Sequence, residues 1–356
     1  MTQQLVQILG AFRLAGAPAS CEPYGCGHIN ETALVVTDRG RRYILQKINR
    51  FTFRDVTGLM ANIRAVTEHL RRKTSDPRAV LTLVPTHGGE SYLHAQGEYW
   101  RVYDFVEDTL CLQLPETDDD FYQSAVGFGT FQQLLTDFPA QQLHETIPNF
   151  HNTPDRYRIF RETLARDPMG RAAQIGPEID FVLAREKEMS AIQTALASGD
   201  LPLRVTHNDT KLNNVLLDAK TRRALCVIDL DTVMPGSALY DFGDSIRFGA
   251  ATAVEDERDL SKMEMSLDRY RVFTRGYLRS CPGLTAKELE MLPMGAKTMT
   301  MECGVRFLTD YLDGDHYFSI HRDGQNLDRA RTQFKLVQDM ERKWPQMHNI
   351  IEEETP

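Results

Sequence analysis

Four polar residues in the segment VTHNDTKLNN have types and spacing that suit phosphoryl transfer. His207, Asp209, Lys211 and Asn214 form the pattern H-x-D-x-K-x-x-N. Phosphoryl transfer needs a carboxylate that accepts the proton of the acceptor hydroxyl, oxygen ligands for magnesium and a cation near the moving phosphate. Asp209 is therefore the candidate base, Asn214 a candidate magnesium ligand five residues later, and Lys211 the candidate cation. The alternative is a polar loop whose Asn and Asp only satisfy a turn.

Two acidic signatures follow in VIDLDTVMPGSALYDFGDS, and they differ in their distance from the candidate base. Asp229 lies 229 − 209 = 20 residues after Asp209, enough for one hairpin to return the chain beside the loop. Asp241 lies 241 − 209 = 32 residues after it, with a Pro-Gly pair between. Because Asp229 also ends the apolar stretch ALCVI, we expect a rigid strand to present it as a metal ligand.

The neighbouring acids receive different interpretations. Asp231 shares a face with Asp229 by the period of two in a strand, which predicts a second metal ligand or a bridging group. The literal Asp-Phe-Gly that begins at Asp241 matches a metal-binding motif in its letters but lies too far along the chain. We expect Asp241 or Asp244 to support the site through hydrogen bonds.

Residues near the N-terminus could hold a nucleotide. Lys47 lies in the otherwise apolar stretch YILQKIN, where an unpaired ammonium is costly, and Glu68 on the next helix could pair with it while Lys47 binds phosphates. The turn that contains Gly25 and Gly27 could cover phosphates with backbone N–H groups. The alternatives are a surface lysine on an edge strand and an ordinary hairpin turn.

The elements that must position these residues fall into two groups. Residues 22–49 read as strand, turn and strand, 55–73 as an amphipathic helix, and 81–86, 91–97 and 98–107 as three further strands. The predicted class is therefore α+β, beginning with a small antiparallel sheet. The end of this part, Phe105 to Glu107, is where backbone groups could bind an adenine.

The rest of the chain is mainly helical in pattern. Helices are expected over 178–198, 257–279, 285–312 and 326–343, and two short strands, NNVLL and ALCVIDL, carry the acidic motifs. We predict an N-terminal nucleotide-binding lobe over 1–107 and a C-terminal catalytic and substrate-binding lobe over 108–356.

Composition narrows the class of partner. With 41 Lys plus Arg against 50 Asp plus Glu, the formal charge of −9 argues against nucleic acid. No apolar run approaches the roughly 20 residues of a membrane span, no secretion signal is evident, and the six cysteines lack metal-site spacing. We expect a cytoplasmic protein, monomeric or weakly self-associating, with a small molecule as its substrate.

Taken together, these motifs resemble the aminoglycoside phosphotransferase and choline kinase superfamily, which has a two-lobed protein-kinase-like fold. More narrowly, three strings are similar to those of N-acetylhexosamine 1-kinases: THNDTKLNNVLLD, VIDLDTVMPG with YDFGDSIRFGA, and MECGVRFLTDYLDGDHYF. Many superfamily members have Gly after the motif His and His two residues beyond the Asp, whereas this chain has Asn208 and Lys211 there. That departure bears on the acceptor and leaves the kinase chemistry in place.

The resemblance implies a reaction and a set of site residues. It implies transfer of the γ-phosphate of ATP, with Mg²⁺, to the anomeric hydroxyl of N-acetylglucosamine or N-acetylgalactosamine. Asp209 would be the base, Asn214 and Asp229 magnesium ligands, and Lys47 a ligand of the nucleotide phosphates. The candidates for the sugar pocket are Arg306, Asp310, Tyr317 and Phe248, with an Arg–Asp pair between helices as the alternative for the first two.

Two other functions stay open. A kinase of the same kind could act on another small hydroxyl acceptor, such as choline, homoserine, methylthioribose or a different sugar. A quaternary amine calls for an aromatic cage, and the sequence has only two tryptophans. A non-catalytic nucleotide-binding protein with a kinase fold is the third reading, but the base and metal positions are all filled here.

Overall fold

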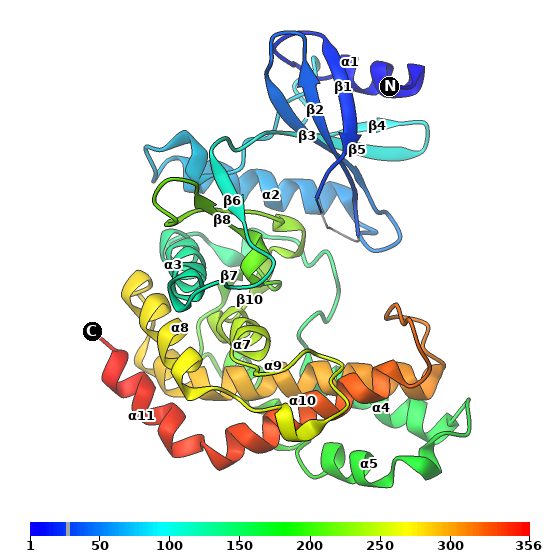
Figure 1. Cartoon of the computed structure of the whole chain (residues 1–356), viewed down its shortest axis with the longest axis vertical. Coiled ribbons are helices and arrows are strands. Elements are labelled where there is room, and N and C mark those ends of the chain that lie inside the picture. Colours follow the sequence, from blue (N-terminus) through cyan, green and yellow to red (C-terminus); the bar gives the residue numbers. More distant parts are fainter. Residues whose placement is uncertain (26–28) are drawn as a thin grey trace. The chain divides into compact units, whose positions relative to one another are not determined.

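The computed structural model describes residues 1–25 and 29–356 (Figure 1). The chain forms two compact units, and each unit draws on three separate stretches. Unit 1 comprises Met1–Cys111, Asp137–Pro148 and Val215–Pro235; unit 2 comprises Leu112–Thr136, Asn149–Asn214 and Gly236–Pro356. The predicted class is confirmed, because an antiparallel sheet occupies the N-terminal part and helices dominate the C-terminal part.

Unit 1 is built around a five-stranded antiparallel sheet in the order β1-β2-β3-β5-β4. The strands are β1 (Pro18–Pro23), β2 (Glu31–Thr37), β3 (Arg42–Ile48), β4 (Leu93–Ala95) and β5 (Glu98–Asp104). The predicted hairpin is β2 and β3, whose turn contains Gly40 at φ 73°, a left-handed conformation that glycine adopts without steric cost. Of the three further strands expected, 81–86 forms only isolated bridges at Leu83 and Thr86.

Two helices supply apolar residues to unit 1. Helix α1 (Gln3–Gly10) precedes the sheet, and its Ile8 and Leu9 join a buried cluster with Leu45 and Trp100 of the sheet. Helix α2 (Val56–Arg71) is capped by Asp55, which accepts a hydrogen bond from the Gly58 N–H. Unit 1 also contains the 3₁₀ turns η1 (Pro77–Ala79), η2 (Ala140–Gln142) and η6 (Leu230–Thr232).

A second, three-stranded antiparallel sheet of unit 1 leads to the acidic motif. Its order is β6-β8-β9, with β6 (Thr109–Cys111), β8 (Val215–Asp218) and β9 (Ala224–Val227). Val215 at the start of β8 is opposite Val227 at the end of β9. The predicted hairpin between the two chemical motifs is therefore present. The short strand β10 (Met234–Gly236) crosses from unit 1 to unit 2.

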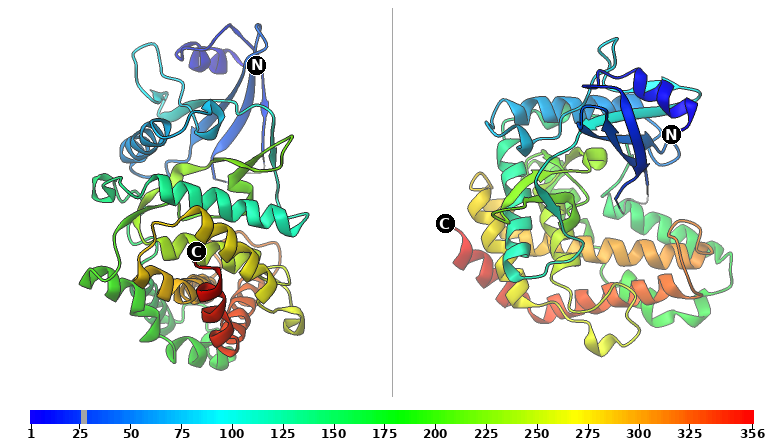
Figure 2. Two further views of the ribbon diagram at one scale, coloured as in Figure 1. Left: turned by 90° about the vertical axis from the view of Figure 1, so that its left-hand side faces the viewer. Right: turned by 45° about the horizontal axis from the view of Figure 1, so that its top comes forward.

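Unit 2 is mainly helical. Its helices are α3 (Asp118–Leu134), α4 (Thr153–Arg166), α5 (Gly176–Leu183), α6 (Ala191–Ser198), α7 (Ala238–Gly249), α8 (Leu267–Ser280), α9 (Ala286–Asp313), α10 (Gln325–Arg342) and α11 (Trp344–Glu354). Short elements are β7 (Arg204–Thr206), η3 (Ala172–Gln174), η4 (Glu188–Ser190), η5 (Leu212–Asn214) and η7 (Leu260–Lys262). Figures 1 and 2 show the long helix α9 lying side by side with α10.

Two helix predictions differ from the structure in length. The stretch 178–198 divides into α5 and α6, with η4 between them, and the helix expected from 257 begins only at Leu267, after its cap Ser266. Acidic residues at 118–120 form the first turn of α3, where Thr117 and Asp120 form a capping box.

Candidate active site

The loop after β7 brings three of the predicted residues together in unit 2. Lys211 Nζ lies 2.8 Å from Asp209 Oδ1. Asn214 Nδ2 donates to Asp209 Oδ2 at 3.1 Å and to its backbone oxygen at 2.9 Å. The side chain of Asp209 is 28% exposed. A carboxylate that is held in one orientation yet partly exposed can accept a proton from a bound hydroxyl.

His207 fixes the course of this loop from below. The residue is completely buried, and its ring meets the edges of Phe128 and Phe131 on α3 at centroid distances of 5.4 and 5.9 Å. The Asp209 N–H donates to His207 Nδ1 at 3.3 Å. His207 therefore supports the loop from the core, whereas Asp209 is the partly exposed carboxylate of the loop.

Asp241 of the Asp-Phe-Gly triplet holds the backbone of the same loop. Its two carboxylate oxygens accept hydrogen bonds from the N–H groups of His207 and Asn208, each at 2.8 Å. Asn208 has φ 65°, a left-handed conformation that needs such support. Burial raises the pKa of Asp241, against the opposing effect of His207 and these N–H groups. The prediction that Asp241 acts through supporting hydrogen bonds is confirmed.

Asp244, one turn later on α7, supports the next part of the loop. It accepts a hydrogen bond from the Thr210 N–H at 3.2 Å and one from Arg247 Nε at 3.0 Å. Burial opposes ionisation of Asp244, but Arg247 and Lys211 outweigh it and lower its pKa. Burial also opposes the charge of Lys211, and Asp209 outweighs it, so the pKa of Lys211 is raised. Both groups are therefore charged at neutral pH.

Phe242 and Gly243, the other two residues of the triplet, pack α7 against neighbouring helices of unit 2. Phe242 is completely buried, and its ring lies 5.5 to 5.9 Å from those of Tyr270, Phe273 and Tyr277 on α8. A Cβ added to Gly243 would lie 2.3 Å from the backbone oxygen of Gly295 on α9. The triplet thus belongs to a helix that carries the loop, and its glycine permits close helix packing.

In unit 1, the turn after β9 contains the two remaining acids. Asp229 has φ 58°, and Asp231 follows in η6. The Asp231 carboxylate lies 2.5 Å from Arg101 Nη1 and accepts a hydrogen bond from Arg101 Nη2 at 2.9 Å. It also accepts a short hydrogen bond from Asn30 Nδ2. Asp231 is thus held by a guanidinium and an amide, and its predicted metal contact stays a prediction.

The predicted pair of Lys47 and Glu68 is replaced by two other ion pairs. Lys47 pairs with Glu31, and Glu68 with Arg64 at 2.8 Å. Lys47 is opposite Trp100 on β5, while the adjacent Gln46 is opposite Arg101. Successive side chains in a strand point to opposite faces, so Lys47 lies on the other face of the sheet from Arg101.

Sequence reasoning missed Arg101 and Asn62. Arg101 is 1% exposed, and Asn62 on α2 is completely buried with its Nδ2 donating to Val233 O at 3.0 Å. The unusual charge in the apolar stretch EYWRVYDF was a signal for Arg101, by the same reasoning that was applied to Lys47. An asparagine on the apolar stripe of a helix was a weaker signal for Asn62.

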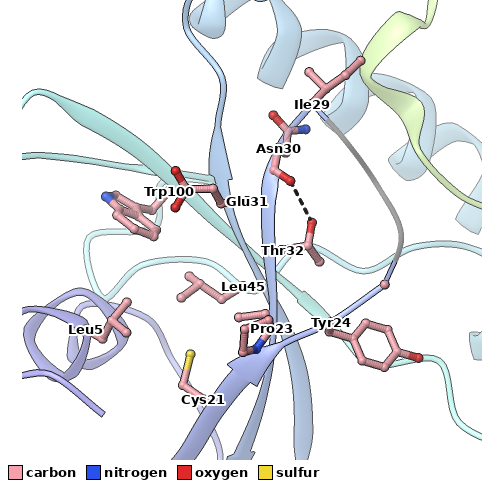
Figure 3. Close-up of a pocket in the computed structure, with 12 residues that line it drawn as sticks. Leu5, Cys21, Pro23, Tyr24, Ile29, Asn30, Glu31, Thr32, Leu45 and Trp100 are labelled. Carbon is pink, nitrogen blue, oxygen red and sulfur yellow. Dashed lines mark hydrogen bonds between the residues drawn. The ribbon is translucent and has the colours of Figure 1, made fainter. Parts of the chain in front are cut away.

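The turn predicted to cover phosphates is only partly described. Gly27 lies outside the described residues, and Gly25 has φ 80°. Gly25 and Asn30 help to line a cavity of about 600 Å³ in unit 1, together with side chains of β1, β2, β3 and β5 (Figure 3). Near Asn30, Thr32 Oγ1 donates to the Asn30 backbone oxygen at 3.5 Å.

The proposed adenine-binding segment already uses some of its polar groups. The Phe105 N–H donates to the backbone oxygen of Arg42 at 3.2 Å. The Arg42 guanidinium lies 4.3 Å from the centre of the Phe105 ring and forms an ion pair with Glu107. Tyr24 meets the Phe105 ring edge-on at 5.8 Å.

The chain matches the model of one protein family. A model described as the phosphotransferase enzyme family matches residues 20–273, more than half of the 356 residues. The chain belongs to this phosphotransferase family. Its H-x-D-x-K-x-x-N loop, the α7 helix that holds it and the turn with Asp229 all lie within the matched residues.

Solved structures share the fold of this phosphotransferase along almost its whole length. An aminoglycoside phosphotransferase from Alicyclobacillus acidocaldarius is 12% identical with a TM-score of 0.65, and the match covers 99% of this chain and 97% of that one. A microcompartment-associated aminopropanol kinase is 16% identical (TM-score 0.59, coverage 97% and 98%). An amicoumacin kinase solved with AMP-PNP and Ca²⁺ is 15% identical (TM-score 0.60, coverage 96% and 94%). These similarities establish the fold.

The candidate sugar residues of the phosphotransferase lie in two settings. Arg306 Nη2 is 3.4 Å from the Tyr317 hydroxyl, and Tyr317 is 71% exposed. Asp310 is buried and accepts hydrogen bonds from the N–H groups of residues 316–318 and from Asn326 Nδ2, at 2.8 to 2.9 Å. Asp310 therefore shapes the loop that presents Tyr317. Phe248, at the end of α7, is 36% exposed.

The residues predicted to bind magnesium carry amide and carboxylate oxygens. No group of three or more His, Cys, Asp or Glu side chains that could hold a metal ion occurs within residues 1–25 and 29–356. Asn214, in unit 2, and Asp229, in unit 1, stay predictions as magnesium ligands. The Asn214 nitrogen faces Asp209, which leaves the amide oxygen on the other side of the group. Amide and carboxylate oxygens are hard ligands of the kind that Mg²⁺ prefers.

No helix among the described residues is long and apolar enough to cross a membrane.

Proposed function

We propose that this phosphotransferase transfers the γ-phosphate of ATP to the anomeric hydroxyl of an N-acetylhexosamine, N-acetylglucosamine or N-acetylgalactosamine. The observation that carries the proposal is the Asp209 carboxylate, held by Lys211 and Asn214 at 2.8 and 3.1 Å at the surface of unit 2. The choice of sugar is supported by the long strings that resemble N-acetylhexosamine 1-kinases, above all the one that contains Arg306 and Tyr317.

Asp209 would orient the anomeric hydroxyl and accept its proton as the oxygen attacks the γ-phosphorus, while the bond from that phosphorus to the bridging oxygen breaks and ADP leaves. Lys211 would exchange its contact with Asp209 for a contact with the transferring phosphate. There its positive charge would offset the negative charge on the phosphate oxygens. Because Lys211 keeps its proton at neutral pH, it can serve as such a cation throughout turnover.

Asn214 and Asp229 would hold Mg²⁺ of the magnesium–nucleotide substrate, and the ion would supply charge neutralisation at the β- and γ-phosphates. ATP as donor is supported by the amicoumacin kinase that was solved with an ATP analogue and a divalent cation. Gly25, Gly27, Lys47, Glu68, Phe105 and Glu107 stay predictions for the nucleotide.

On the acceptor side, Arg306 and Tyr317 would bind the sugar. A guanidinium offers several donors to hydroxyl or acetamide oxygens, and an exposed phenol ring offers a flat apolar surface to a pyranose ring. Asp310 and Phe248 would contribute indirectly, Asp310 by holding the loop of Tyr317 and Phe248 as part of the pocket wall.

A phosphorus NMR assay tests this function. The protein is incubated with ATP, Mg²⁺ and N-acetylglucosamine or N-acetylgalactosamine, and a product whose phosphorus couples to the anomeric proton is expected. Parallel samples with choline and aminopropanol test amino alcohols as acceptors, because one of the structures with a similar fold is an aminopropanol kinase. Phosphate on C6, or turnover of an amino alcohol alone, would contradict the proposal.

A further inference from the structure

A buried ion pair in unit 1 connects the five-stranded sheet to the turn that contains Asp229. Arg101 on β5 is 1% exposed and Asp231 is 3% exposed. Arg101 Nη1 and Nη2 lie 2.5 and 2.9 Å from the Asp231 carboxylate oxygens. Removing one member of such a pair leaves the other charge buried without a counter-charge, which makes its geometry strongly determined.

Neighbouring amides fix both members of this pair. Arg101 Nε donates to Gln46 Oε1 on β3 at 2.9 Å, and Gln46 Nε2 donates to Thr32 Oγ1 on β2 at 3.1 Å. Three adjacent strands therefore position the guanidinium. Asn30, immediately before β2, donates a hydrogen bond from its Nδ2 to the Asp231 carboxylate. The Asn30 side-chain oxygen in turn accepts the Asn49 N–H at 2.9 Å.

The turn itself needs external support. Asp229 has φ 58°, a left-handed conformation that Asp adopts more readily than most non-glycine residues but that still costs free energy. Two residues later, Asp231 is held by Arg101 and Asn30. Four residues later, the backbone oxygen of Val233 accepts the buried Asn62 Nδ2 at 3.0 Å.

We propose that Arg101 and Asp231 are positioning residues that hold Asp229 in the conformation in which it takes the magnesium of the nucleotide substrate. The role of Asp229 in this statement rests on the proposed function. Asp231 acts through Arg101 and the turn, and neither residue touches the metal.

The test compares Arg101→Met with Asp231→Asn. If Asp231 were a metal ligand, these two variants would have different effects on magnesium binding. If Asp231 were itself a metal ligand, Arg101→Met would remove a competing cation and leave magnesium binding equal or tighter. If Asp231 is a positioning residue, Arg101→Met and Asp231→Asn both release the turn. Loss of a residue that orients a metal ligand typically weakens metal affinity about 10-fold to 100-fold.

Binding of ADP is measured by calorimetry with Mg²⁺ and again with EDTA, so that no catalysis is involved. Both substitutions are expected to weaken magnesium-dependent ADP binding by about 10-fold or more and to leave binding in EDTA within about 2-fold. The matched control is Asp339→Asn in unit 2, another buried carboxylate held by two cations, Arg342 and Lys343. It is expected to leave both affinities unchanged.

Two further variants cover the case in which a single substitution unfolds the protein. Arg101→Lys keeps the charge and should show an intermediate loss. The double variant Arg101→Met with Asp231→Leu leaves no unpaired buried charge and should fold, while still losing magnesium-dependent binding. Unchanged or tighter binding in Arg101→Met, or a double variant that binds like the wild type, would overturn the proposal. Wild-type ADP binding that is indifferent to Mg²⁺ would instead count against the proposed function.

Discussion

At the residue scale, three acids have different roles in the short loop around Asp209. Asp209 is partly exposed and contacts Lys211, whereas Asp241 and Asp244 are buried and bind backbone N–H groups. Acids of one type thus take different roles according to burial and partner. Only the exposed one is available to a substrate.

Replacement of Asp209 by Asn is expected to remove the base while keeping the shape of the loop. Turnover should fall by about 100-fold to 10,000-fold, the usual contribution of a general base. ADP affinity and the melting temperature should stay near wild-type values, because Asn can still accept the hydrogen bond from Asn214. The measurement is a steady-state ADP-release assay beside calorimetry, with Glu290→Asn, an exposed position on α9, as the control. An Asp209→Asn variant within tenfold of wild-type turnover would show that another group takes the proton.

Sequence reasoning at this scale succeeded where spacing along the chain set the geometry. Asp209, Lys211 and Asn214 are close in sequence, so one loop conformation brings them together. It missed Arg101 because the partner of this residue, Asp231, lies 130 residues away. It paired Lys47 with Glu68 because the face of the strand to which a lysine points could not be deduced without the register of the sheet.

At the scale of elements, helix α7 decides where the Asp209 loop lies. The helix is capped by Ser237, carries Asp241 and Asp244, and packs against α9 where Gly243 meets Gly295. Side chains larger than hydrogen do not fit at this crossing. Helix packing and support of the loop therefore explain the residue types of the Asp-Phe-Gly triplet.

Gly243→Ala is expected to destabilise the protein and to reduce turnover together. The new Cβ would lie 2.3 Å from the Gly295 backbone oxygen, and a backbone atom cannot move away cheaply. A loss of about 1–3 kcal/mol in the free energy of unfolding is the usual cost of such overpacking. The control is Gly176→Ala at the start of α5, where nothing lies within 4 Å of the added Cβ.

Urea unfolding monitored by circular dichroism measures both variants, and an ADP-release assay measures turnover. The control should match or slightly exceed wild-type stability. A Gly243→Ala variant as stable as the control would mean that α7 and α9 do not meet as the structure shows.

Sequence patterns predicted most elements because local periodicity and caps determine them. The hairpin of β2 and β3 and helix α2 follow from alternation and from an apolar stripe. The stretch 81–86 was predicted as a strand from its apolar residues, but it makes only isolated bridges. Its hydrogen-bonding partners depend on tertiary contacts that no local pattern encodes.

At the scale of the whole molecule, buried acids stabilise unit 2 in a pH-dependent way. Burial opposes ionisation of Glu302 on α9, but His151 and Thr153 outweigh it, so its pKa is lowered. Asp339 on α10 is lowered in the same way, chiefly by Lys343 once burial is overcome. A lowered folded-state pKa contributes stability above the unfolded pKa, about 4 for these acids, and that stability is lost as the pH falls below it.

The wild-type free energy of unfolding is therefore expected to fall as the pH goes from 6 to about 3.5. Glu302→Gln should be less stable at pH 6 and should lose less on acidification, because its titrating group is gone. Urea titrations at several pH values check this. Glu290→Gln, an exposed change on the same helix, should keep the wild-type slope. Equal slopes for wild type and Glu302→Gln would contradict the prediction.

Because the chain is synthesised from its N-terminus, the two members of the Arg101–Asp231 pair become available at different times. Unit 1 includes Val215–Pro235, so it cannot be completed while only its N-terminal stretch has left the ribosome. The two partners are 130 residues apart, and at about 5–20 residues per second the nascent sheet must wait roughly ten seconds for its carboxylate. During that interval β5 carries a guanidinium with no counter-charge. The ion pair that fixes β5 to the acidic turn can therefore form only after Asp231 has been synthesised.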